Sequence, residues 1–221
     1  MTDLWPAMAL SLRVALVATA LTVLVGVPLA FFLARRRFVG RSLIEAAITA
    51  PLVLPPTVVG YLLIVAVGAR SPVGSSLRSL FDGYSLMFNW HGAVLAAAVV
   101  ALPMLYLPAR AAFAGVDREL EDAARQLGAN RLQLFFHVSL PLARKGIASG
   151  VLLAFARALG EFGATVMVLG HLPRRQTLPI SIYAKYEAGE LAAATGAVVV
   201  LVVISLGVMF VYNRSNLSRQ D

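Results

Sequence analysis

The sequence contains no cysteine and few charged side chains. None of its 221 residues is Cys, and Asp, Glu, Lys and Arg together make up only 14% of the chain. The absence of thiols excludes disulfides, thiolate nucleophiles and thiolate metal ligands. The sequence also lacks a P-loop motif (GxxxxGKS or GxxxxGKT), an HExxH motif and any nucleophile–base arrangement. We therefore expect no ATP site, no metal site, no cofactor and no enzyme activity in this chain.

Long apolar runs occupy most of the chain. Hydrophobic residues make up 59% of the sequence, which is more than a soluble domain can bury. Five runs reach, within a residue or two, the roughly 20 helical residues that cross a hydrocarbon core. Because a backbone in lipid must satisfy its own hydrogen bonds, each run should be helical. The sequence predicts an all-α membrane protein, with a single transmembrane domain over residues 1–221 and spans near 10–34, 45–69, 91–110, 146–170 and 191–213.

The basic residues are distributed unevenly between the two sides of these spans. The first and third loops and the C-terminal tail contain twelve: Arg35, Arg36, Arg37, Arg41, Arg110, Arg118, Arg125, Arg131, Arg144, Lys145, Arg214 and Arg219. The other two loops contain five: Arg70, Arg78, Arg174, Arg175 and Lys185. The positive-inside rule makes the richer side cytoplasmic, with the N-terminus outside and the C-terminus inside. We attribute the net charge of +8 to topology and expect no nucleic-acid partner.

The second predicted span contains several prolines. The stretch "APLVLPPTVVGYLLI" includes Pro51, Pro55 and Pro56. Proline removes an N–H donor and clashes with the preceding helical turn. In a membrane this is tolerated where neighbouring helices or a watery cavity satisfy the freed carbonyls. Two interpretations remain open: a kink that only serves packing, or a kink in which Pro55 and Pro56 shape a translocation path.

The fourth predicted span contains two opposite charges. Arg157 and Glu161 lie four residues apart in "LAFARALGEFGAT", so they share one helix face. Charges at mid-bilayer are expensive and mark either a buried pair or a functional site. Both interpretations stay open, and Thr165 is a further candidate for the path. A net-neutral pair disfavours tight anion binding and suits a conduit that releases its cargo.

Residues 115–141, the interspan segment, form the most polar part of the chain. One apolar helical face is predicted by residues at i, i+3, i+4 and i+7, namely Leu120, Ala123, Ala124 and Leu127. Asp117 is the expected N-cap of this helix. Gly128 follows the last apolar position and is expected to end the helix in a left-handed conformation.

A second short helix is predicted within the interspan segment. Asn130 and Gln133 have the spacing of a capping box, and we expect the helix to end at Leu140–Pro141 because the residue before proline avoids helical geometry. The pattern is typical of an amphipathic hairpin on the membrane surface. The alternative is a rigid helix that docks into a groove of a cytoplasmic partner.

The spacing of the interspan segment resembles the EAA loop of bacterial ABC importer permeases. That family pattern is Glu-Ala-Ala, three residues, Gly, nine residues, then Ile-x-Leu-Pro. This sequence departs from it at Asp122, which replaces Glu, and at Val138, which replaces Ile. In that family the loop forms the coupling helix that seats in a cleft of the ATP-hydrolysing subunit. The resemblance assigns this role to Glu121, Asp122, Ala123, Ala124, Gly128, Val138, Leu140 and Pro141.

Three other stretches are similar to molybdate importer permeases: "PLVLPPTVVGYLLI", "HGAVLAAAVVALP" and "LAFARALGEFGAT". Together with the EAA-type loop, the resemblance extends over residues 11–212. It implies inward transport of molybdate, with tungstate as a second candidate cargo, across the bacterial plasma (inner) membrane. Sulfate and thiosulfate permeases contain motifs similar to "GEFGA", so transport of another oxyanion is the alternative to molybdate transport. An ion-coupled secondary transporter is less favoured, because the sequence has no internal repeat and few ionisable groups within the spans.

The same resemblance implies partners. Two cytoplasmic ABC ATPase subunits would bind ATP and Mg²⁺, and an extracytoplasmic molybdate-binding protein would deliver the cargo. Five helices are few for a pore in one chain, so we expect a second copy of it in a homodimer that works by alternating access. Candidates for docking the binding protein are the basic residues of the second outside loop: Arg174, Arg175 and Lys185.

Overall fold

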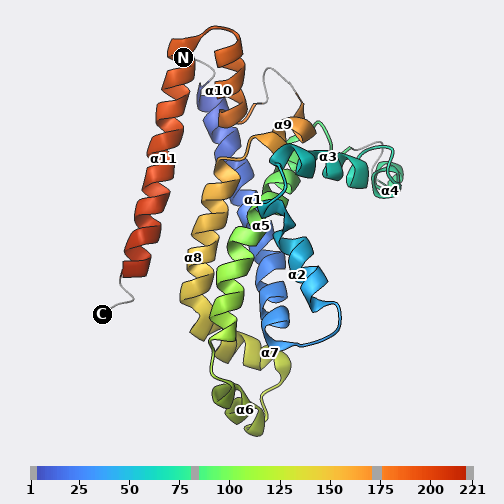
Figure 1. Ribbon diagram of the computed structural model, residues 1–221, viewed down its shortest axis with the longest axis vertical. Coiled ribbons are helices and arrows are strands. Elements are labelled where there is room, and N and C mark those ends of the chain that lie inside the picture. Colours follow the sequence, from blue (N-terminus) through green and yellow to red (C-terminus); the bar gives the residue numbers. More distant parts are fainter. Residues whose placement is uncertain (1–3, 81–84, 171–175, 218–221) are drawn as a thin grey trace.

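The computed structural model describes residues 4–80, 85–170 and 176–217, and every regular element within those ranges is helical (Figure 1). In that part of the chain, four helices are long and apolar enough to cross a membrane: α1 (Leu4–Arg35), α5 (Trp90–Ala114), the continuous helix Arg131–Leu159 and α11 (Leu191–Leu217). A bent pair of helices is the fifth candidate. The expected all-α membrane fold with about five spans is confirmed.

Helix α5 packs against both α1 and α8 (Leu140–Leu159) and forms the centre of the core. Small residues permit this close approach between helices. A Cβ built on Gly26 of α1 would lie 2.9 Å from Leu105 Cδ2 of α5. A Cβ built on Gly150 of α8 would lie 2.9 Å from the Leu105 carbonyl oxygen, which is a backbone atom and cannot swing away. Glycine at position 150 therefore sets the distance between α5 and α8.

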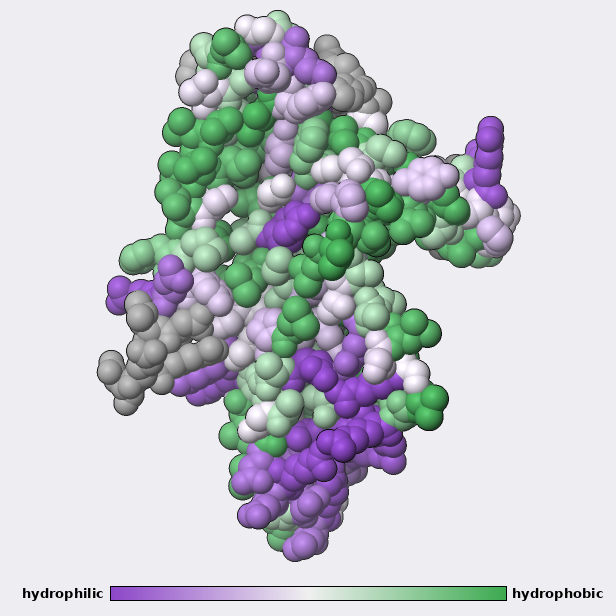
Figure 2. All heavy atoms as spheres, in the orientation of Figure 1, coloured by the Kyte–Doolittle hydropathy of each residue, from purple (hydrophilic) through white to green (hydrophobic). Residues whose placement is uncertain are grey.

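Helix α11 is the most exposed of the long helices. Its most apolar window is 11% buried, whereas that of α5 is 61% buried. α11 packs mainly against α10 (Leu178–Glu187), and the two run side by side at one edge of the molecule (Figure 1). Several of its large apolar side chains are exposed: Val198, Val199, Val202, Val203, Leu206 and Phe210. Apolar surface covers this edge in the space-filling view (Figure 2) and is available to lipid or to another protein.

The second predicted span is bent by 120° instead of forming one kinked helix. α2 (Arg41–Thr49) continues into the short turn η1 (Ala50–Leu52), and the chain restarts as α3 (Pro56–Val67). Proline explains the break, because Pro55 holds an extended ψ of 134° and Pro56 has no N–H to continue a helical ladder. α3 then leads sideways to α4 (Pro72–Leu80) (Figure 1).

The caps predicted for the interspan segment are confirmed. α6 (Arg118–Gln126) begins after Asp117, whose carboxylate accepts a 3.0 Å hydrogen bond from the Glu119 N–H. Gly128 follows α6 with a φ of 87°. α7 (Arg131–Leu134) begins with the expected capping box, in which Asn130 and Gln133 exchange two hydrogen bonds of 2.9 Å.

The expected end of the second short helix at Leu140–Pro141 is wrong. The helix runs without interruption from Arg131 to Leu159. It passes Pro141 through the π-helical turn η2 (Phe135–Ser139), in which the Leu140 N–H donates to the Phe135 carbonyl five residues earlier. The wider turn accommodates the proline ring and its missing donor. The fourth span, expected at 146–170, breaks at residues 160–162 before α9 (Gly163–Leu169).

Candidate functional site

The apolar face predicted for α6 points away from the bundle. Leu120 is 51% exposed and Leu127 is 89% exposed. α6 lies at the far end of the molecule (Figure 1), where most of the surrounding surface is hydrophilic (Figure 2). Apolar side chains that project from a polar tip suit contact with another protein.

A cavity lies beside Gly128 and brings several predicted residues together. Its volume is about 450 Å³, and it is lined by Ala124, Leu127, Gly128, Ala129, Gln133, His137 and Val138. The left-handed φ of Gly128 creates the turn between α6 and α7 that forms one wall. Leu140 packs instead against the core, and Pro141 lies on the exposed start of α8. The structure therefore separates the motif into an outward-facing part and a part that anchors α8.

Glu121 faces inward, in contrast to its neighbours on α6. Its side chain is 3% exposed, and its Oε1 lies 2.6 Å from Arg35 Nη2 at the end of α1. Ser139 Oγ in η2 donates to the same oxygen at 2.8 Å. Arg35 Nη2 also donates to the Val116 carbonyl at 3.2 Å. Asp122, the next residue, remains exposed and pairs with Arg125.

The sequence did not indicate that Arg35 and Ser139 belong to this site. Arg35 is one of several arginines in the first loop, and its assigned role was topology alone. Ser139 lies inside the EAA-type spacing at a position that the pattern leaves free. No sequence signal separates Arg35 from Arg36 and Arg37, because only the packed structure shows that the Arg35 side chain is the one largely buried.

A basic pocket lies behind the Arg35–Glu121 pair. Its volume is about 670 Å³, and four of its eight lining residues are arginine: Arg35, Arg36, Arg125 and Arg131. The remaining wall comes from Phe31, Ala129, Asn130 and Leu134. Glu121 and Asp122 neutralise part of this charge through their ion pairs with Arg35 and Arg125.

The Arg157–Glu161 pair forms at the break between α8 and α9. Arg157 Nη1 lies 2.5 Å from Glu161 Oε2, with the arginine side chain 28% exposed and the glutamate side chain 1% exposed. Within the described residues, Glu161 Oε2 accepts no hydrogen bond, so its contact with Arg157 is an ion pair only. Glu161 Oε1 accepts a 2.8 Å hydrogen bond from the Ala164 N–H. The carboxylate thus holds the arginine and ties the start of α9 to the end of α8.

The two broken spans touch one another at this level. A Cβ on Gly163 of α9 would lie 2.9 Å from Pro56 Cβ of α3. A Cβ on Gly60 of α3 would lie 2.9 Å from the Ala164 carbonyl oxygen. The structure therefore brings Pro56, Glu161 and the first turn of α9 together, although they come from separate spans.

Thr165 and Pro55 complete the predicted path residues. Thr165 is 1% exposed, and its Oγ1 has no hydrogen-bond partner within the described residues. Pro55 is exposed at the start of α3. A hydrophilic patch interrupts the apolar surface near the upper end of α8 (Figure 2), at the helix end that carries the partly exposed Arg157.

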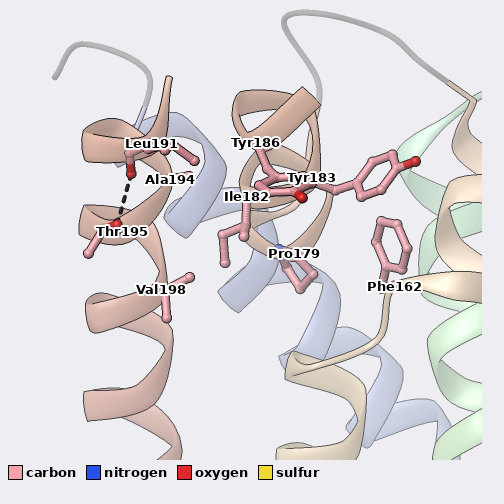
Figure 3. A pocket seen from close by; sticks show the side chains of 9 residues that line it. All are labelled: Phe162, Pro179, Ile182, Tyr183, Tyr186, Leu191, Ala194, Thr195 and Val198. Carbon is pink, nitrogen blue, oxygen red and sulfur yellow. Dashed lines mark hydrogen bonds between the residues drawn. The ribbon is translucent and has the colours of Figure 1, made fainter. Parts of the chain in front are cut away.

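An apolar pocket between α10 and α11 is a poor candidate for an anion path (Figure 3). Its volume is about 430 Å³. The rings of Phe162 and Tyr183 lie 5.3 Å apart at one side, and Thr195 Oγ1 donates to the Leu191 carbonyl of its own helix. All nine lining residues, which belong to the described part of the chain, are uncharged. An anion in this pocket would lose water and gain no opposite charge.

One of the three predicted docking residues can be located. Lys185 on α10 lies 3.7 Å from Glu190 Oε2 and is largely buried, which leaves little free positive charge there. Arg174 and Arg175 lie outside the described residues.

Residues 26–218 match the family model described as binding-protein-dependent transport system inner membrane component. The molybdenum transport system permease protein ModB of Escherichia coli (strain K12) is 40% identical over 219 residues, which cover 98% of this chain and 95% of that protein. A protein described as the putative molybdenum transport system permease protein YvgM, from Bacillus subtilis (strain 168), is 42% identical over 202 residues, or 91% and 88% of the two chains.

The fold is similar to that of a solved structure of the MetNI methionine ABC transporter in inward-facing conformations. The TM-score is 0.66, and the match covers 96% of this chain and 92% of that one. The sequence identity is 17%, so this similarity concerns the arrangement of helices.

Proposed function

This chain belongs to the binding-protein-dependent transport system inner membrane components and is a multi-pass permease subunit of an ABC importer, and from this premise we propose that its cargo is molybdate. The observation that carries the proposal is the nearly full-length similarity to two proteins named as molybdenum permeases. The matched stretch of this chain spans the residues of both helix breaks and of the interspan segment. These relatives do not favour the sulfate or thiosulfate alternative. Tungstate, a tetrahedral dianion like molybdate, is the second proposed cargo.

We assign the exposed face of α6 to contact with a separate cytoplasmic ATPase subunit, one for each copy of this chain. ATP and Mg²⁺ would bind to that partner. Leu120 and Leu127 project far enough to enter a groove, which is how short amphipathic helices are recognised. The cavity beside Gly128 offers the same partner a second point of contact.

A second copy of this chain would complete the translocation path. A homodimer and the surrounding lipid would together cover two exposed features. These are the apolar side chains of α11 and the partly exposed Arg157. A two-fold pair is the commonest closed assembly of identical chains. An extracytoplasmic binding protein would dock on the outer loops, with Arg174, Arg175 and Lys185 still the proposed contacts, although Lys185 would first have to leave Glu190.

The Arg157–Glu161 pair at the break between α8 and α9 supports a path that binds its anion only weakly. A dianion is attracted to Arg157 and repelled by Glu161, so it would be held briefly and then released. ATP binding would close the two ATPases and draw the two α6 helices together, which would turn the helices from inward-facing to outward-facing. Such a shift needs unequal ligand affinity for the two states, and ATP provides it on the partner.

The proposed cargo is tested with the full complex in proteoliposomes. We expect molybdate to stimulate ATP hydrolysis only when the binding protein, the ATPase and this chain are all present. Radiolabelled molybdate should accumulate, and unlabelled tungstate should compete with it. Competition by sulfate as strong as that by unlabelled molybdate would overturn the cargo assignment, and uptake without the ATPase would overturn the mechanism.

The membrane orientation is testable because the chain has no native cysteine. Leu127→Cys at the end of α6 should react with a membrane-impermeant maleimide only in inverted vesicles, since we propose that α6 is cytoplasmic. Ala188→Cys, in the exposed turn after α10, should react in intact spheroplasts. The unsubstituted chain is the label-free control. The reverse labelling pattern would contradict the assigned topology.

A further inference from the structure

We propose that the Glu121 carboxylate is the positioning group that transmits movement of α6 to α1 and α8. The inference rests on the proposed ATPase contact at α6 and names the residue that connects this contact to the membrane helices. Glu121 would not touch the ATPase. It would act from the inner side of α6, through Arg35 and Ser139.

Glu121 is well placed to make this connection. Among the nine residues of α6, all of which the structure describes, Glu121 is the buried one. The other residues of the helix are exposed or half-buried, so α6 has little apolar packing with which to follow the bundle. A helix held mainly by one buried polar group moves with the partners of that group.

Glu121 Oε2 lies 3.7 Å from Arg125 Nη2 on the same helix. The partners of the other carboxylate oxygen, Oε1, belong to two separate transmembrane helices. Arg35 is the last residue of α1, and its Nη2 lies 2.6 Å from Glu121 Oε1. Ser139 ends η2, the turn that continues directly into α8, and its Oγ lies 2.8 Å from the same oxygen. One carboxylate oxygen therefore links the ends of two spans to the helix that we assign to the ATPase.

The contact between Glu121 and Arg35 is made by charged groups, so it depends on the identity of both side chains. Arg35 is 13% exposed in its side chain, and its Nε is buried without a hydrogen-bond partner within the described residues. Removing the negative charge would leave this guanidinium beside Arg36, Arg125 and Arg131 around the basic pocket. Breaking a buried pair by removing one partner is costly, whereas a surface pair contributes little. The position of α6 relative to α1 should thus depend on Glu121 more than on any exposed acid nearby.

The test uses Glu121→Gln in the complete complex of this chain, the ATPase and the binding protein. Glutamine keeps the side-chain length and one acceptor but removes the charge. We expect the ATPase to co-purify as with the unsubstituted chain. Uptake per ATP hydrolysed should fall by at least about tenfold, because the buried ion pair that positions α6 loses one of its charges. Hydrolysis should lose most of its response to the molybdate-loaded binding protein.

Glu119→Gln is the matched control, since it removes the same charge from an exposed position of the same helix. It should leave association, hydrolysis and uptake unchanged. Ser139→Ala removes one hydrogen bond without stranding a charge and should lower uptake per ATP by a smaller factor. The exchange Arg35→Glu with Glu121→Arg should recover part of the coupling that each single substitution loses.

Each result decides a separate question. Normal uptake per ATP in Glu121→Gln overturns the proposal. Loss of ATPase association in that variant also overturns it, because Glu121 would then belong to the docking surface. If Glu121→Gln fails to insert into the membrane, Ser139→Ala becomes the test. Normal uptake per ATP in Ser139→Ala would then count against the proposed link between α6 and the two spans. Failure of the unsubstituted chain to bind the ATPase would contradict the proposed function itself, whatever the variants do.

Discussion

Replacing Gly128 with valine is expected to abolish coupled molybdate uptake while leaving membrane insertion intact. Gly128 has a φ of 87°, and a left-handed backbone costs a residue with a Cβ about 1–2 kcal/mol, with β-branched residues disfavoured most. A Cβ at this position would meet nothing within 4 Å, so the cost is purely conformational. The chain would relieve it by reorienting α6 against α7. Leu127 would then leave its place, and the ATPase would hydrolyse ATP without moving the helices.

Two variants separate this effect from a general loss of stability. Gly128→Asn should retain most of the uptake, because asparagine tolerates the left-handed region. Gly40→Val introduces the same strain at a φ of 91°, also in open space, but in the turn between α1 and α2. It should leave coupling close to normal. Uptake is followed with radiolabelled molybdate and hydrolysis by phosphate release, and normal uptake in Gly128→Val would count strongly against α6 as the coupling helix.

Replacing Glu161 with glutamine is expected to destabilise the chain strongly. The substitution keeps an acceptor for the Ala164 N–H but leaves Arg157 without its ion-pair partner at the break between α8 and α9. Removing one member of a buried pair costs about 3–5 kcal/mol, and the partial exposure of Arg157 puts the expected loss toward or below the lower figure. The midpoint of thermal unfolding in detergent should fall, and so should uptake.

The double variant Arg157→Met with Glu161→Gln distinguishes the two interpretations of this pair. It removes both charges while keeping the hydrogen bond at the start of α9, and replacing a whole buried pair is often nearly neutral for stability. We expect the unfolding midpoint to recover while uptake stays low, because the path would lack the cation that attracts the dianion. Recovery of both would mean that the pair only packs. Recovery of neither would mean that the arginine is needed for the fold.

Several features of the site were predictable because they depend on residues close in sequence. Asp117, Asn130 and Gln133 cap their helices as expected, since a cap involves backbone groups two or three residues away. The ion pair between Arg157 and Glu161 follows from their spacing of one helical turn. The EAA-type spacing drew attention to the interspan segment without revealing which side of it faces outward.

Other predictions failed or were incomplete where distant residues compete with local preference. Proline was expected to end the helix at Leu140, yet a π-helical turn lets it continue into α8. The second span turns by 120° instead of kinking, and α3 then packs on α9 through Gly60. The inward position of Glu121 also went unpredicted, because its partner Arg35 lies in another span.

The sequence by itself determined which segments are helical, which of them are apolar enough for lipid, and where the interspan segment caps and turns. Hydropathy and capping act within a turn or two of the chain, so they can be read from neighbouring residues. Only the tertiary structure decided that the apolar side of α6 faces outward, that Glu121 joins two spans, and that both helix breaks meet. Those features depend on which distant residues can bury a charge or approach a glycine, and only the packed chain brings them together.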